Sequence, residues 1–60
     1  MTGDTLITRM VEAPSLAEAR AIVDQAPRAA LFEAADLLYV DCADHGMRWI
    51  RNAVVSEARA

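Results

Sequence analysis

The spacing of hydrophobic positions predicts four short helices. In four segments of the chain, apolar residues recur every three to four positions, which is the period of one helical face. Pro14, Pro27 and Gly46 separate these segments, as expected of the two residue types that most often interrupt helices. The sequence therefore predicts an all-α fold, a compact bundle of three or four short helices, in a single helical domain over residues 1–60.

The first two segments have recognisable starts. The first covers residues 4–13, and Asp4 is its expected N-cap. A strand over residues 5–13 is the alternative, although no second strand is predicted to pair with it. The second segment starts with Ser15 and Glu18, whose S-x-x-E spacing is typical of a capping box. The expected buried face of this second helix consists of Leu16, Ala19, Ile22, Val23 and Ala26.

The third segment is apolar on two sides and starts at Pro27, which suits the first position of a helix. One face carries Leu31, Ala34, Ala35, Leu38 and Cys42, and it is widened by Phe32 and Tyr39. Ala30, Leu37 and Val40 fall on the other side. A helix with two apolar sides is either central in its domain or covered by a partner. A short strand over residues 37–40 is the alternative.

The fourth segment is amphipathic and follows Gly46. Its expected apolar face consists of Met47, Ile50, Val54 and Ala58, extended by Trp49 and Ala53. A separate stripe at helical spacing consists of Arg48, Asn52, Val55 and Arg59. We expect a helix break at Gly46, where a glycine would suit the end of the third helix. One long helix through this position is the alternative.

The small size of the chain favours association with a partner. A domain of 60 residues buries a small core, and such domains usually gain stability from disulfides, a metal, exceptional helix packing or a partner chain. Cys42 is the only cysteine, so no disulfide can form within the chain. We therefore predict a homodimer, or contact with another protein. The predicted partner-binding residues are Leu37, Val40, Trp49 and Ile50. For Trp49, a place in the core of the bundle is the simpler interpretation.

Charge is distributed unevenly along the chain. Residues 1–44 contain eight acidic residues and three arginines, whereas residues 45–60 contain three arginines and one acidic residue. Arginine contacts phosphates and guanine, and asparagine suits adenine. The alternative function is therefore a helix-turn-helix-like nucleic-acid-binding protein that uses Arg48, Asn52 and Arg59. Nucleic-acid-binding domains normally carry a basic excess, and this chain has a net charge of −3, so protein contacts are favoured.

The residues of the chain give little support to catalysis. Cys42 and His45 share a helical spacing and could bind a metal or act as nucleophile and base, but no second pair of such ligands is present. Gly-rich phosphate loops and G-x-S-x-G turns are also lacking. The sequence predicts a non-enzymatic binding or regulatory module with no catalytic residues, no metal site and no cofactor.

Two further patterns concern the setting of the protein. No apolar run reaches the length of a membrane span, and the first residues do not resemble a signal peptide, so we expect a cytoplasmic protein without membrane contact. Every basic residue except His45 is arginine, and alanine is abundant, which is typical of a high-GC bacterial or phage genome.

Overall fold

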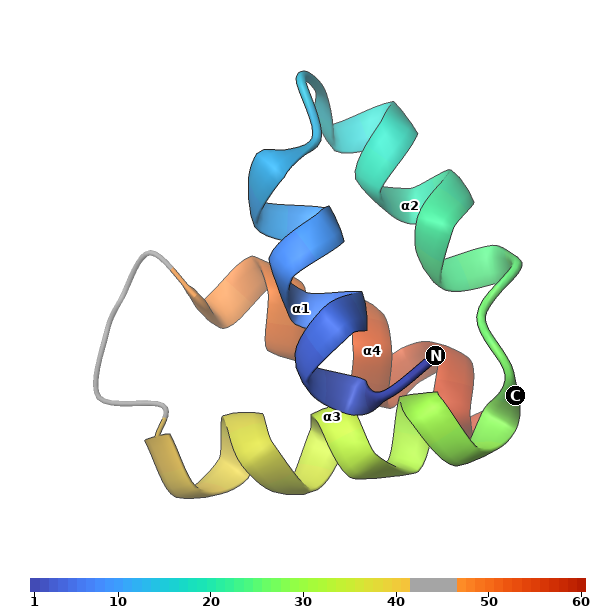
Figure 1. Cartoon of the computed structure of the whole chain (residues 1–60), viewed down its shortest axis with the longest axis vertical. Helices are drawn as coiled ribbons and strands as arrows, with labels where there is room; N and C mark the ends of the chain where they lie inside the picture. The colour runs from blue at the N-terminus through green and yellow to red at the C-terminus, as the bar shows by residue number, and fades with distance from the viewer. Residues whose placement is uncertain (42–46) are drawn as a thin grey trace.

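The part of the chain that the structure describes contains four helices (Figure 1). The computed structural model describes residues 1–41 and 47–60, and for residues 39–41 the backbone alone. The helices are α1 (Gly3–Glu12), α2 (Leu16–Asp24), α3 (Arg28–Asp41) and α4 (Arg48–Arg59). The predicted all-α fold is confirmed, and both segments for which a strand was the alternative are helical. The helix break expected at Gly46, like Cys42 and His45, lies outside the described residues.

Side-chain caps begin the first two helices. The N-cap of α1 is Thr2, whose Oγ1 accepts a hydrogen bond of 3.1 Å from the Thr5 N–H. The prediction of Asp4 as N-cap was wrong, and this residue lies in the first turn, where its negative charge faces the positive end of the helix dipole. Ser15 caps α2 as predicted, because its Oγ accepts from the Glu18 N–H at 3.2 Å.

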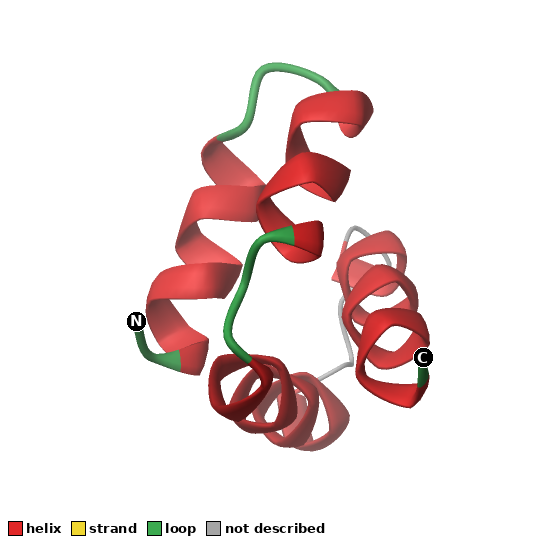
Figure 2. Ribbon diagram, turned by 90° about the vertical axis from the view of Figure 1, so that its right-hand side faces the viewer, coloured by secondary structure: helices red, strands yellow, loops and turns green. Residues whose placement is uncertain are grey.

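The helices pack around one shared core. α1 and α2 lie side by side as a hairpin, α3 runs past their open end, and α4 packs against α3 and α2 (Figure 2). Residues 13–15 join α1 to α2, and residues 25–27 join α2 to α3. α3 begins at Arg28, so Pro27 precedes the first helical residue and its carbonyl accepts the first helical hydrogen bond, from Leu31.

The core is formed by apolar side chains from all four helices. Among the residues that the structure describes, the buried apolar side chains are those of Leu6, Met10, Ala19, Val23, Ala30, Leu31, Ala34, Leu38, Ile50 and Val54. The Cα radius of gyration is 10.0 Å, close to the value of about 10 Å that compact domains of this length have.

Three apolar residues of α2 and α3 lie on other sides of their helices than predicted. Ala30 is buried rather than outward-facing, because it lies one turn before Ala34 and shares its side of α3. Leu16 is exposed, since it is the first residue of α2 and projects beyond the core. Phe32 is also exposed, and its ring lies under the guanidinium of Arg28 at 5.4 Å.

Two contacts that the sequence did not indicate join α3 to its neighbours. Gly3 of α1 lies so close to α3 that an added Cβ would be 2.5 Å from the Ala34 backbone nitrogen, and the Gly3 N–H donates to Glu33 Oε1 at 3.1 Å. At the other side of α3, Arg28 donates from Nη2 to the Ala58 carbonyl oxygen at 2.7 Å. This bond satisfies a carbonyl in the last turn of α4.

Candidate protein-binding surface

Two large apolar side chains are exposed together at the start of α2 and α4. Leu16 is 58% exposed and Trp49 is 38% exposed. They line a hollow of about 370 Å³, with Ala13 and Ser15 completing its wall. The position follows from local structure, because Leu16 comes directly after the Ser15 cap and Trp49 is the second residue of α4. An apolar side chain of a partner protein could therefore contact the exposed apolar surface of Leu16 and Trp49.

The hollow continues along the line where α2 and α4 meet. A second hollow of about 370 Å³ shares Leu16 and Trp49 with the first and extends to Arg20 on α2. Its lining on α4 is completed by Asn52, Ala53 and Ser56. Because the side chain of Ala53 is only a methyl group, it fills little of the space between α2 and α4 at this point. The middle of the groove therefore combines one arginine with small and amide side chains.

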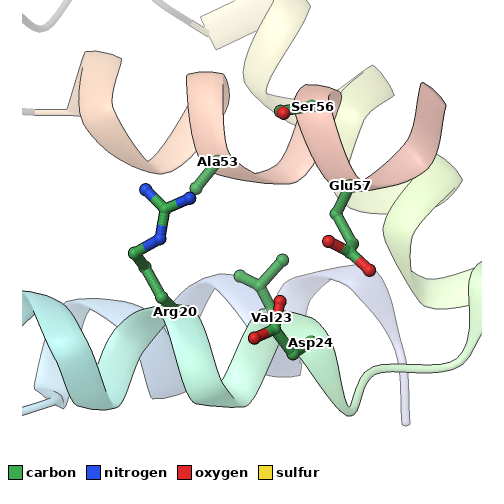
Figure 3. A pocket seen from close by; sticks show the side chains of 6 residues that line it. All are labelled: Arg20, Val23, Asp24, Ala53, Ser56 and Glu57. Atoms are coloured by element: carbon green, nitrogen blue, oxygen red, sulfur yellow. The ribbon is translucent and has the colours of Figure 1, made fainter. Parts of the chain in front are cut away.

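Acidic residues line the far end. There, Arg20, Val23 and Asp24 of α2 face Ala53, Ser56 and Glu57 of α4 across a narrow space of about 20 Å³. Figure 3 shows Arg20 extending from α2 toward Ala53, and Glu57 reaching from α4 toward α2. We call the whole surface the α2–α4 groove, defined by Leu16, Arg20 and Asp24 on α2 and by Trp49, Ala53 and Glu57 on α4.

The chemical nature of the residues that line the groove changes in regular steps along it. On each helix, its three defining residues are four positions apart, so successive residues are separated by about 6 Å along the helix axis. The shared linings pair Leu16 with Trp49, then Arg20 with Ala53, then Asp24 with Glu57. α2 and α4 therefore run in the same direction along the groove. Its lining passes from apolar residues to Arg20 and then to a space where Asp24 and Glu57 join Arg20.

The structure separates the four residues that were predicted to bind a partner. Trp49 lies at the apolar end of the groove, and it is exposed rather than a core residue. Ile50, its neighbour in the chain, is 1% exposed and faces the core, so it supports the fold. Leu37 is 39% exposed on α3 and does not line the groove. The side chain of Val40 lies outside the described residues.

The basic stripe of α4 is exposed as a second surface. Arg48, Asn52 and Arg59 all lie on the solvent side of the helix. Asn52 and Arg59 line a hollow of about 350 Å³, and the rest of its lining is Arg51, Val55 and Ser56. The three residues predicted to contact nucleic acid thus share one helix face. Asn52 and Ser56 also line the α2–α4 groove, so the two surfaces adjoin.

Of the six residues that define the groove, Trp49 alone was predicted to bind a partner. Leu16 and Ala53 were expected on the apolar faces of their helices, and the charged residues Arg20, Asp24 and Glu57 were not assigned to a binding site. One signal in the sequence was the four-residue spacing of Leu16, Arg20 and Asp24, which places the three in a row along α2. That spacing does not say which helix lies alongside the row.

Comparison of the chain with protein-family models, curated proteins and solved structures finds no match. Within residues 1–41 and 47–60, no group of three or more histidine, cysteine or acidic residues is placed to hold a metal ion. In the same part of the chain, none of the helices combines the length and the apolar character that a membrane crossing requires.

Proposed function

We propose that the chain is a non-enzymatic binding or regulatory module that acts through protein–protein contacts at the α2–α4 groove. One observation carries this proposal: Leu16 and Trp49 expose their side chains next to one another although the core is closed without them. Tryptophan and arginine are enriched among the residues that dominate binding energy at protein interfaces, and the groove contains both. Covering the exposed part of Leu16 would remove apolar surface from water, which favours association.

The test compares groove variants with a matched surface variant in a cell extract of the source organism. Leu16→Ser and Trp49→Ala should lose partners that the unchanged chain retains in affinity capture. Val11→Ser is the control, because Val11 is equally exposed but lies on α1, away from the groove linings. Equal retention of the same partners by all three variants would contradict the proposal.

The homodimer expected from the sequence stays a prediction. The surface that a second copy would cover is the exposed apolar end of the groove. Light scattering over a wide concentration range measures this directly. A mass of twice the chain that falls to one chain in Trp49→Ala would show that the groove is a self-association surface.

Nucleic-acid binding by α4 is the second candidate function. The exposed arrangement of Arg48, Asn52 and Arg59 favours it. The acidic pair Asp24 and Glu57 nearby and the net charge of −3 count against it. Connections of three residues, the length typical of a helix-turn-helix motif, lead into α2 and α3, whereas six residues separate α3 from α4.

The salt dependence of duplex DNA binding tests this second function. Binding that weakens steeply with salt, and whose slope against log salt concentration falls by about 1 in Arg48→Ala, is the expected result for phosphate contacts. No binding to mixed-sequence duplex DNA at low salt would rule it out.

A further inference from the structure

We propose that the α2–α4 groove receives an amphipathic helix of another protein, running antiparallel to α2 and α4. One face of this helix presents a basic, an acidic and a large apolar residue, in that order along the sequence and four positions apart. The inference rests on the proposed protein-binding function and identifies the chemistry of the partner.

The order of residues in the groove determines the order in the partner. The hollow at Leu16 and Trp49 has room for a large apolar side chain. One step along the groove, Arg20 is the only charged residue of the second hollow, so it favours an acidic residue opposite it. A further step along, Asp24 and Glu57 line a narrow space of about 20 Å³ together with Arg20, so the acidic side chains outnumber the basic one and favour a basic residue at the rim of this space.

The spacing and the backbone chemistry favour a helix as the occupant. Residues four apart on a helix rise about 6 Å, which equals the step of the groove. An extended segment with alternate residues in the groove would have a similar step, but its inward backbone groups would need partners. In the second hollow, the uncharged polar side chains that could serve as such partners are those of Asn52 and Ser56. A helix satisfies its own backbone, so only its side chains need complements.

The direction follows from the parallel course of α2 and α4. Both helices have their N-terminal ends at the apolar end of the groove and their C-terminal ends at the acidic end. The C-terminal ends carry partial negative charge. An antiparallel helix places its positive N-terminal end, together with its basic residue, beside these ends and beside Asp24 and Glu57. In sequence order, its face therefore reads basic, acidic, apolar.

A second copy of the chain does not supply this face. Arg20 and Asp24 are the only basic and acidic residues in the sequence with this order and spacing, and Arg28 follows them where an apolar residue is required. Nucleic acid does not match the groove either, because its phosphates would meet Asp24 and Glu57. The complement is thus a different protein.

The experiment uses the full chain and two synthetic alanine-based helical peptides of the same composition. The matching peptide carries Lys, Glu and Leu at positions i, i+4 and i+8, and the control peptide has Lys and Glu exchanged. Trp49 is the only tryptophan, so its fluorescence reports occupation of the groove. We expect the matching peptide to shift the Trp49 emission to shorter wavelength and to bind about tenfold more tightly than the control.

A charge-reversed protein sharpens the test. In Arg20→Glu, the preference should reverse, because the residue opposite position 20 would then need to be basic. Arg20 is exposed, and circular dichroism checks that the variant keeps its helical content. The two peptides on the unchanged protein test the proposal without any variant.

Four outcomes would overturn the inference. The first is equal binding of the two peptides, and the second is that neither peptide binds at millimolar concentration. The third is a shift of the Trp49 emission that duplex DNA alone produces. The fourth is a dimer that the Trp49→Ala substitution dissociates while neither peptide binds. The last outcome would retain the proposed protein-binding function and assign the groove to a second copy. Partner capture that depends on Leu16 and Trp49 tests that function separately.

Discussion

Two helix contacts of this small bundle differ in how completely they close. α1 meets α3 at Gly3, where the backbones approach so closely that no methyl group fits between them. α2 meets α4 over Ala53, while Leu16 and Trp49 stay exposed at one end of the contact and leave a groove. The first contact is closed at backbone distance, and the second leaves apolar side chains exposed. The proposed function therefore assigns stability and binding to different residues, even where these are neighbours in the sequence.

The largest difference is expected between Ile50 and Trp49. Ile50→Ala removes a fully buried side chain and should lower the free energy of unfolding by about 2–5 kcal/mol, which would leave a domain of this size largely unfolded. Trp49→Ala should cost about 1 kcal/mol, since this ring lies at the surface. Urea denaturation followed by circular dichroism measures both. Equal losses would mean that Trp49 belongs to the core.

Gly3→Ala tests the closed contact. Alanine is the better helix former and, at this first position of α1, would by itself add less than the value of about 1 kcal/mol for a helix interior. Here its Cβ would collide with the backbone of α3, so we expect a net loss of about 1–3 kcal/mol. The sign of the change in thermal denaturation decides between the two effects. An increase in melting temperature would show that α1 and α3 can separate slightly without cost.

A smaller loss is expected on removing the polar part of the same contact. Glu33→Ala leaves the Gly3 N–H without its acceptor and should cost about 1 kcal/mol. Asp36→Ala is the matched control on the same helix, because Asp36 is exposed, and it should change stability by less than about 0.5 kcal/mol. Chemical denaturation of the two variants side by side measures the difference. Equal stability would mean that the Glu33 carboxylate adds nothing to the contact.

The smallest effect on stability is expected in the groove itself. Leu16→Ser should change the free energy of unfolding by at most about 0.5 kcal/mol, because more than half of the leucine is already in water. The same variant should lose the protein contacts proposed above. A large loss of stability would assign Leu16 to the fold and leave the groove without its apolar end.

Much of the fold was predictable because α1, α2 and α4 each bury one stripe of apolar residues. The helical period located all four helices, and the S-x-x-E spacing identified the Ser15 cap. α3 was harder, because apolar residues surround it and periodicity alone does not decide which of them face the core. Ala30 and Phe32 were consequently placed on the wrong sides.

The groove was not predictable in the same way. It depends on the pairing of Leu16 with Trp49, which are far apart in the sequence, and no local pattern specifies that α2 and α4 run side by side. The contact of Gly3 with α3 is of the same kind, since a glycine near the start of a chain resembles an ordinary loop residue until its neighbour in space is known.

The hydrogen bond from Arg28 to the Ala58 carbonyl has a consequence for local opening. Final turns of helices usually fray independently of the rest of a protein, and their amide hydrogens exchange quickly with solvent. Here the last turn of α4 is tied to the first residue of α3, so it cannot unwind without breaking that bond. The end of α4 and the beginning of α3 should therefore open together, as one cooperative unit, and their amides should be protected from exchange to a similar degree.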